Sequence, residues 1–331
     1  DGLPLPGGYL LLADDEKTLS KRMEKDSYFV RVYAKNQMYT GKHIATKLWV
    51  GDYTTGDTFE KFAQKAEGIK RIGVLRADVD NLGQTFVAGF AGKYATLSRT
   101  AALSRQLSIF FKYYIRSILK NGEYHIDGEK KLTERNATIV YSGGDDVFIV
   151  GAWNEVIELS IDLQEKFKKY TQGTLSISSG IGIYECTYPI GAIANETGEM
   201  EAESKRMPEK DSVTLMDDGE THLINELEIC DGTYRWEELY KSVLGEKYDV
   251  IQDFLGESDE RGMSFLYRML ELIRNQKEKI NFARFVYLLS RLEPDKEGEK
   301  KEKYRKFSRK MYQWVQSEKD CRELKTAINL Y

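Results

Sequence analysis

Two short acidic segments contain the side chains of this 331-residue chain that are best suited to chemistry. The first is Asp78-Val79-Asp80-Asn81-Leu82-Gly83, and the second is Gly143-Gly144-Asp145-Asp146. If the fold brings their carboxylates together, each pair ~4 Å apart repels by roughly 4 kcal/mol at an effective dielectric of ~20. A proton or a cation must then neutralise them. The sequence therefore predicts a cation site formed by Asp78, Asp145 and Asp146.

Hard carboxylate oxygens with open coordination positions suit Mg²⁺, which shares the rest of its shell with water and substrate phosphates. Such an ion neutralises charge on phosphate oxygens and lowers the pKa of an attacking hydroxyl. Gly143 and Gly144 lack Cβ atoms, so a ligand can approach the turn closely. The amides of Asn81, Leu82 and Gly83 can bind phosphate oxygens in the same region. The predicted chemistry is metal-assisted phosphoryl transfer.

A predicted sheet brings the two acidic segments together. Residues 71–79 are a short apolar run followed by a turn, which indicates a buried strand. Residues 137–141 and 147–151 are β runs separated by Ser142 and the glycine turn, a pattern typical of a hairpin. In a ferredoxin-like sheet the first strand and the hairpin strands are central neighbours. Asp78 is therefore expected beside Asp145 and Asp146.

Further periodic segments complete a β-α-β-β-α-β pattern, so the predicted fold class is α+β with a ferredoxin-like domain followed by a helical domain. Helices are expected from 3.6-residue periodicity and strands from alternation, with Asn154 as a helix N-cap. The expected helices are 58–66, 97–119, 155–170 and 190–207, and the further strands are 174–183 and 212–216. Lys205, near the end of the last of these helices, can reach over the sheet edge to a triphosphate.

The chain divides into three segments by pattern: a small β-rich piece at 1–67, the α+β domain at 68–235 and a helical domain at 236–331. Within the last, residues 296–310 carry eight Lys or Arg against three Glu, interleaved with Tyr304 and Phe307. Such a segment can follow an RNA backbone, although a solvated helix face is the simpler interpretation.

Composition excludes several classes of protein. A formal net charge of −4 excludes a bulk polycation, so any nucleic-acid contact must be a local patch. No apolar run approaches the ~20 residues of a membrane helix, so no membrane partner is expected. Cys186, Cys230 and Cys321 are far apart, which argues against a disulfide framework and favours the reducing cytoplasm. Because the sequence opens on Asp1 rather than Met, we expect a piece of a longer protein.

Four strings together resemble a known family: RIGVLRADVDNLGQTF, IVYSGGDDVFIVGAW, LSISSGIGIY and AESKR. They resemble the GGDD-type catalytic palm of the signature large subunit of type III-A (Csm-type) CRISPR effector complexes. The resemblance covers residues 68–216; residues 236–331 look like that subunit's C-terminal domain, and residues 1–67 like the end of its linker region. It implies synthesis of cyclic oligoadenylates from ATP with Mg²⁺ or Mn²⁺, activated by target RNA, beside CRISPR RNA and other subunits of the complex.

The resemblance also implies a role for each matching residue. Asp78 and Asp145 are the implied metal ligands, assisted by the Val79 carbonyl, and Asp146 is an essential neighbour and a possible second ligand. The triphosphate would be held by the amides of Asn81, Leu82 and Gly83, and Lys205 would hold its far end. Gly143 and Gly144 would admit the nucleotide, and Ser142 would contact its base or ribose. Asp80 shares the alternation of Asp78 and is either a further ligand or structural.

Two departures and two alternatives qualify this interpretation. The family's nuclease domain and first palm find no match in this sequence, so DNA cleavage by this chain is not expected. In the family two palms face each other, so we expect that synthesis needs a second palm supplied in trans. One alternative is a non-catalytic nucleotide-binding scaffold of the ribonucleoprotein. The other is a diguanylate cyclase-like enzyme, which is disfavoured because Phe86 stands where guanine recognition needs an Asn and Asp146-Val147 replaces Glu-Phe.

Overall fold

The computed structural model describes residues 3–6, 8–10, 17–18, 21, 24, 32–35, 46–217, 219–256, 261–274, 279–294 and 297–331. The chain forms two compact units, Asp1–Gly51 and Asp52–Tyr331. In the first unit, β1 (Leu3–Leu5) pairs antiparallel with β2 (Gly8–Leu10), and β3 (Tyr33–Lys35) pairs parallel with β4 (Thr46–Leu48).

The second unit begins at Asp52, within the segment predicted as a linker region. Its first helix, α2 (Phe59–Lys65), starts where the Thr58 side chain accepts a hydrogen bond from the Lys61 N–H. Phe62 and Ala63 of this helix are buried in a cluster with strand residues of the main sheet. The boundary therefore lies after Gly51 rather than after residue 67, because the apolar face of α2 covers the sheet.

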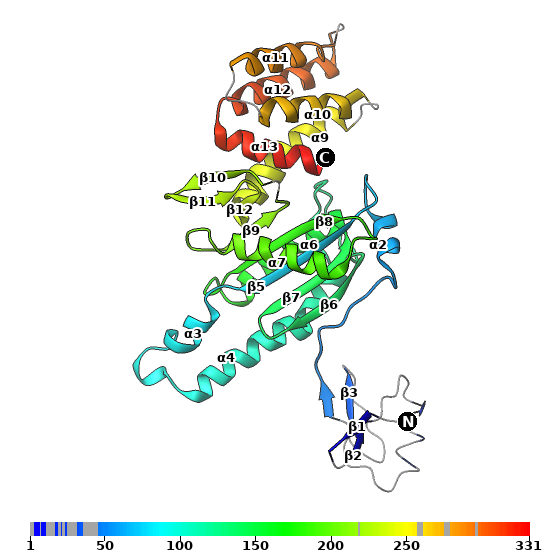
Figure 1. Cartoon of the computed structure of the whole chain (residues 1–331), viewed down its shortest axis with the longest axis vertical. Coiled ribbons are helices and arrows are strands. Elements are labelled where there is room, and N and C mark those ends of the chain that lie inside the picture. The colour runs from blue at the N-terminus through cyan, green and yellow to red at the C-terminus, as the bar shows by residue number, and fades with distance from the viewer. Residues whose placement is uncertain are drawn as a thin grey trace. The chain divides into compact units, whose positions relative to one another are not determined.

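A six-stranded sheet forms the centre of the second unit (Figure 1), in the order β12-β9-β8-β5-β7-β6. β5 lies between β7 and β8 and is antiparallel to both, whereas β9 is parallel to β8. This order is that of a ferredoxin-like sheet with two added edge strands, and it confirms the predicted α+β class. The strands are β5 (Ile72–Val79), β6 (Ala137–Gly143), β7 (Asp146–Ala152), β8 (Ile177–Tyr184), β9 (Ser212–Leu215) and β12 (Thr233–Arg235).

The two faces of the sheet are covered by different helices, as alternation along β5 requires. Ile72 and Val74 are in one buried cluster with α2 and with Ile193 of α7 (Ile190–Ser204). Leu75 and Ala77 are in the other, with α6 (Trp153–Tyr170) and the helix that precedes the hairpin. That helix, predicted as continuous, consists of α4 (Leu97–Ile109), a π-helical segment (Phe110–Tyr114) and α5 (Ile115–Lys120), while the short α3 (Leu82–Ala88) and η1 (Gly92–Tyr94) precede it.

The structure contradicts the cap predicted at Asn154. α6 begins two residues earlier than predicted, at Trp153, and Ala152 occupies the N-cap position without a side-chain hydrogen bond. The Asn154 Oδ1 instead accepts a hydrogen bond of 3.3 Å from the Glu67 N–H. The side chain thus joins the start of α6 to the loop that follows α2, because this backbone N–H lies within its reach.

The C-terminal third is helical, as predicted, and it shares a continuous buried core with the sheet. The Tyr234 hydroxyl lies 2.7 Å from the Thr326 hydroxyl, which joins β12 to α13 (Glu318–Leu330). The Lys247 Nζ lies 2.8 Å from Asp320, which joins η3 (Leu239–Tyr248) to the same helix. The elements are the hairpin β10 (Thr221–Ile224) and β11 (Leu227–Cys230), then α8 (Trp236–Glu238), η3 (Leu239–Tyr248), α9 (Asp249–Leu255), α10 (Arg261–Arg274), α11 (Lys279–Ser290), α12 (Glu299–Trp314) and α13 (Glu318–Leu330).

The basic segment predicted at 296–310 forms most of α12, and its aromatic side chains face inward. Tyr304 and Phe307 are buried, and the Tyr304 hydroxyl donates to the Leu289 carbonyl at 3.1 Å. Lys306 pairs with Asp253 at 3.1 Å and Lys310 with Glu246 at 2.7 Å. These aromatic rings are not available to stack on RNA bases, so the simpler interpretation of this segment fits the structure. Within the described part of the chain, no helix is both long enough and apolar enough to span a membrane.

Gly180 of β8 allows α7 to lie directly against the sheet, because a Cβ there would stand 2.5 Å from both the Glu201 nitrogen and the Thr197 carbonyl oxygen. Gly180→Ala is therefore expected to lower the free energy of unfolding by about 1–3 kcal/mol. Urea unfolding followed by circular dichroism measures this. The control is Gly191→Ala in α7, where a Cβ meets nothing within 4 Å and no loss is expected. Equal unfolding midpoints for the two variants would contradict the close approach.

Candidate active site

The pairing of β5 with β7 brings the two acidic segments together. Asp78 stands directly opposite Asp146 in the register of these strands. Gly144 and Asp145 form the turn between β6 and β7, and the Gly144 φ of 69° is the positive value that glycine supplies at the first position of such a turn. The Val79 N–H donates to the Asp145 carbonyl at 3.2 Å. The convergence predicted from the sheet order is therefore present.

The carboxylates at this turn repel one another, and an ammonium group offsets part of their charge. Burial, followed by the negative charges of Asp78 and Asp146, raises the pKa of Asp145. The Nζ of Lys205, at the end of α7, forms ion pairs with Asp78 and, at 2.7 Å, with Glu201. Burial opposes the charged form of Lys205, but its hydrogen bonds to both carboxylates outweigh this and raise its pKa.

Two residues that the sequence analysis missed hold Lys205 in place. Glu201 lies one helical turn before Lys205, and its second oxygen pairs with the Arg76 Nε at 2.9 Å. Arg76 precedes Asp78 by two residues on β5, so both side chains lie on the α7 face of the sheet. The i, i+4 spacing of Glu201 and Lys205 was the available signal in the sequence. The partnership with Arg76 depends on tertiary packing.

The predicted phosphate-binding amides stand at the start of α3, directly after the strand that carries Asp78. Asn81 has a left-handed backbone with φ of 54°, and its Oδ1 accepts a 2.8 Å hydrogen bond from Lys210. Leu82 is half-buried and Gly83 is exposed. The first N–H groups of a helix have no partner within that helix, so these amides can receive an anion in the way predicted.

Two predicted residues turn away from the acidic turn. Ser142 lies opposite Val147 in the hairpin, on the face that packs against α6 and the helix that precedes the hairpin. Its hydroxyl donates to the Phe111 carbonyl. The predicted contact of Ser142 with a base or ribose is therefore not supported, because alternation turns the side chain into the core. Asp80 is buried and accepts hydrogen bonds from the Ser176 and Ser178 hydroxyls at 2.7 and 3.0 Å. Of the two roles left open for Asp80, the structure favours the structural one.

Tyr141 and Lys112 border the turn on the side of the edge strand β6. The charge of Asp146 raises the pKa of Tyr141, whose hydroxyl lies 3.4 Å from the Gly143 carbonyl oxygen. A Cβ built on Gly143 would stand 3.9 Å from the Lys112 Cε, so a small side chain would fit there without a clash. Tyr141 belongs to the string IVYSGGDDVFIVGAW, but the sequence analysis predicted no role for it or for Lys112. They add a phenol and a cation to the rim of the site.

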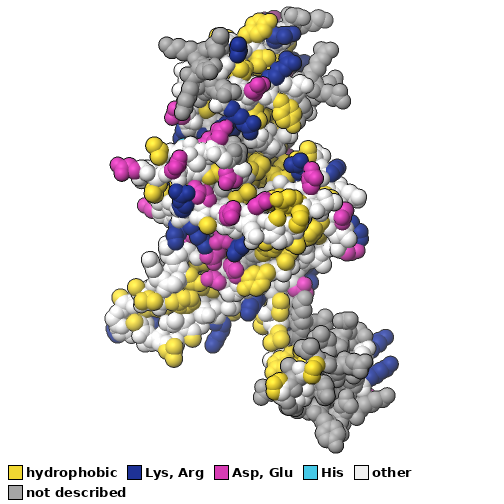
Figure 2. Space-filling view, viewed as in Figure 1, with side chains coloured by type: hydrophobic (Ala, Val, Ile, Leu, Met, Phe, Trp, Pro, Cys, Tyr) yellow, Lys and Arg dark blue, Asp and Glu magenta, His cyan; other side chains and the backbone are white. Residues whose placement is uncertain are grey.

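The acidic turn offers oxygen donors of the kind that an open magnesium-type site uses. Among the described residues, no group of three or more His, Cys, Asp or Glu side chains is arranged so that it could hold a metal ion. Asp78, Asp145 and Asp146 nevertheless offer hard oxygens whose mutual repulsion is only partly offset by Lys205. Mg²⁺ characteristically takes one or two carboxylates and completes its shell with water and phosphates. Figure 2 shows acidic and basic side chains gathered together over the palm, above the α3–α4 arm.

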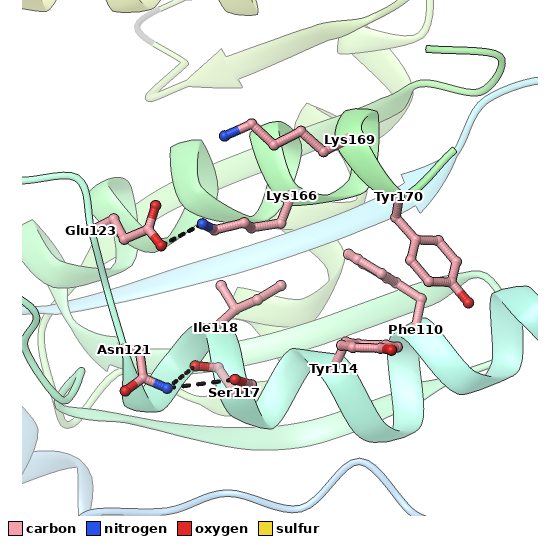
Figure 3. Close-up of a pocket in the computed structure, with 9 residues that line it drawn as sticks. All are labelled: Phe110, Tyr114, Ser117, Ile118, Asn121, Glu123, Lys166, Lys169 and Tyr170. Atoms are coloured by element: carbon pink, nitrogen blue, oxygen red, sulfur yellow. Dashed lines mark hydrogen bonds and ion pairs between the residues drawn. The ribbon is translucent and has the colours of Figure 1, made fainter. Parts of the chain in front are cut away.

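A separate cavity of about 440 Å³ lies on the other side of the sheet, between the helix that precedes the hairpin and the end of α6 (Figure 3). Its polar groups are engaged within the chain: Lys166 pairs with Glu123 at 2.5 Å, and the Asn121 amide donates to the Ser117 carbonyl at 3.0 Å. Phe110, Ile118 and the two tyrosines Tyr114 and Tyr170 supply its apolar walls. This cavity has no convergent carboxylates and is not the predicted site.

A ferredoxin-like sheet with carboxylates at the end of its first strand and in its hairpin turn defines a palm domain. Residues 71–214 match the family model of the Cas10/Cmr2 second palm domain, and residues 252–331 match the second helical domain of the Cmr2 subunit of the CRISPR RNA silencing complex. The chain belongs to the Cas10/Csm1 family of subtype III-A CRISPR systems.

One relative is the CRISPR system single-strand-specific deoxyribonuclease Cas10/Csm1 of Mycobacterium tuberculosis, 42% identical over 339 residues that cover 100% of this chain and 40% of that protein. Two similar crystal structures are of the Csm1-Csm4 cassette. That with one ATP has a TM-score of 0.62 and 26% identity over 86% of this chain and 40% of that chain. The structure with cA3 has a TM-score of 0.61 and 26% identity, and the match covers 85% of this chain and 40% of that chain. The chain thus spans about 40% of the relatives it matches.

Asp145→Asn is expected to stabilise the metal-free protein at neutral pH, because the folded state holds this carboxylate in a partly buried position beside two others. A raised folded-state pKa means that ionisation of Asp145 costs stability as pH rises from the usual value of 3.8 through the folded value. The gain in the variant should therefore shrink as the pH falls toward that usual value. Solvent screening limits it to at most about 1 kcal/mol.

Urea unfolding in a chelating buffer, at neutral and at acidic pH, measures this gain. Glu199→Gln on the exposed side of α7 serves as the control and should leave stability unchanged at both values. A loss of stability in Asp145→Asn at neutral pH would show that the carboxylates do not repel as the structure indicates.

Proposed function

We propose that this chain binds ATP with Mg²⁺ or Mn²⁺ and joins adenylates 3′ to 5′ into cyclic oligoadenylates, as part of a type III-A CRISPR effector complex. The convergence of Asp78, Asp145 and Asp146 at one end of β5 and β7 carries the proposal. The similar Csm1-Csm4 cassettes that contain one ATP or cA3 support it.

The chain's own residues would bind and orient the nucleotide. Asp78 and Asp145, with the Val79 carbonyl, would hold a divalent ion, and Asp146 would be a further ligand. An ion so held supplies activation of a 3′-hydroxyl and neutralises charge on the α-phosphate. A new bond would then form between the 3′-oxygen and the α-phosphorus, the bond to the β-phosphate would break, pyrophosphate would leave, and the hydroxyl proton would pass to solvent.

The other groups at the turn would position the triphosphate. The amides of Asn81, Leu82 and Gly83 would bind its phosphates, and the Lys205 ammonium would bind its far end. Gly143 and Gly144 carry no side chains, so that the nucleotide could lie against this part of the hairpin. Fixed donors of this kind keep the α-phosphate in place while the attacking hydroxyl approaches.

A second nucleotide must supply the 3′-hydroxyl, and we propose that a second palm presents it in trans. The same proposal includes the partners of the relatives: Csm4 and other subunits of the effector complex, together with CRISPR RNA and the activating target RNA, in the cytoplasm. The chain alone is then expected to bind one ATP and to form little product.

A diguanylate cyclase-like function receives no support from the structure around α3. Phe86, near the position where guanine recognition needs an amide side chain, packs against the main core cluster. A half-buried phenyl ring cannot supply the donors and acceptors that distinguish guanine. A titration with ATP and GTP in the presence of Mn²⁺ therefore should favour ATP.

The double variant Asp145→Ala, Asp146→Ala is expected to lower oligoadenylate synthesis more than about 100-fold in the assembled complex, since loss of mere outer-shell partners of a metal already costs 10–100-fold. Product from ATP is measured by chromatography, and binding of target RNA is measured in parallel and should persist. Glu199→Ala is the matched control.

Retained synthesis in the double variant would show that the site is assigned to the wrong residues. If the wild-type complex binds ATP with Mn²⁺ at this turn but forms no product, the nucleotide-binding scaffold is the correct interpretation. Absence of ATP binding would exclude both.

A further inference from the structure

Lys205 contacts a carboxylate that the proposed metal also needs. Its Nζ forms ion pairs with Asp78 and Glu201, and the side chains of Lys205 and Asp78 are both 25% exposed. This ammonium therefore lies at the rim of the acidic turn, where solvent, an ion or a nucleotide can reach it. An ammonium and a divalent ion repel each other, so a metal that arrives at Asp78 competes with Lys205.

The contact of Lys205 with Glu201 differs from that with Asp78, because Glu201 is held from its other side. Glu201 Oε1 accepts from Lys205, whereas Oε2 pairs with the Arg76 Nε at 2.9 Å. Arg76 also donates to the Ala194 carbonyl at 3.4 Å and passes beside Gly198, where a Cβ would lie 2.8 Å from its Nη1. Glu201 is thus fixed within the packing between α7 and β5, and it can retain Lys205 when Asp78 is released.

We propose that Lys205 is a resident counter-ion of the metal-free site, which leaves Asp78 for the triphosphate when metal and nucleotide bind, with Glu201 as its pivot. This inference rests on the proposed function. It assigns Arg76 and Glu201 as positioning residues, and it makes the binding of metal and nucleotide depend on each other. Metal alone must displace the ammonium without compensation, whereas metal with ATP gives the ammonium a new anionic partner.

The inference predicts opposite effects of one substitution on two affinities. Lys205→Met removes the competitor for Asp78, so Mn²⁺ alone should bind at least about 5-fold more tightly, at the lower end of typical coupling between two ligands. The same variant lacks the donor for the triphosphate, so its affinity for ATP in the presence of Mn²⁺ should fall. A lysine that only binds phosphate would show the second effect without the first.

The experiment is a Mn²⁺ titration of the full chain without ATP, in which free Mn²⁺ is measured by electron paramagnetic resonance, and a separate ATP titration at a fixed Mn²⁺ concentration, in which bound ATP is measured by equilibrium dialysis. Arg206→Met is the matched control: it removes the same charge from the adjacent residue, which pairs with Glu203 at 2.6 Å and donates to the Glu228 carbonyl at 2.7 Å. Its two affinities should match those of the wild type. Circular dichroism confirms folding, and Lys205→Gln is the substitute should Lys205→Met not fold.

The outcomes separate this inference from the proposed function. If Lys205→Met or Lys205→Gln binds Mn²⁺ alone no more tightly than the wild type, or if Arg206→Met gains as much, the counter-ion role is wrong. Binding of Mn²⁺ with ATP to the wild type, lost in Asp145→Asn, would then still support the proposed function. If the wild type binds no Mn²⁺ even with ATP, both are wrong.

Discussion

The register between β5 and β7 is the constraint on which the site depends. It places Asp78 opposite Asp146 and beside the turn that carries Asp145. Both faces of β5 are buried, so a slip of one residue would move Leu75 and Ala77 to the opposite face of the sheet, together with every other side chain of the strand. Hydrophobic packing therefore fixes the convergence of the carboxylates and offsets their repulsion. The site is held by the core rather than by contacts of its own.

The packing of α7 provides the electrostatic compensation. Gly180 lets this helix approach β8 so closely that Glu201 and Lys205 lie over the end of β5. Arg76 then joins the helix to the strand through Glu201. Positive and negative side chains therefore alternate toward the acidic turn, in the order Arg76, Glu201, Lys205 and Asp78. A partly neutralised, partly exposed cluster of this kind is suited to exchanging one cation for another, whereas a fully paired buried cluster is not.

Local patterns in the sequence were sufficient for the strands, the hairpin turn and most helices of the palm, since periodicity and turn chemistry depend on near neighbours. They also gave the pairing of Asp78 with the turn, because the order of strands in a ferredoxin-like sheet is a general rule. The same patterns misplaced the N-cap at Asn154, and the contact that the resemblance implied for Ser142 is not supported. In both residues, the partner of the side chain comes from another element: the Glu67 N–H and the Phe111 carbonyl.

Residue type and spacing are local properties, and they sufficed to identify the side chains suited to chemistry and the elements that carry them. The hydrogen bonds of Asp80 to the serines of β8, and the ion pairs that join Arg76, Glu201 and Lys205, became visible only in the folded molecule. The same is true of the face of the hairpin on which Ser142 lies. The physical reason is that a hydrogen bond or an ion pair depends on distances between elements far apart along the chain, and these are set only when the helices pack on the sheet.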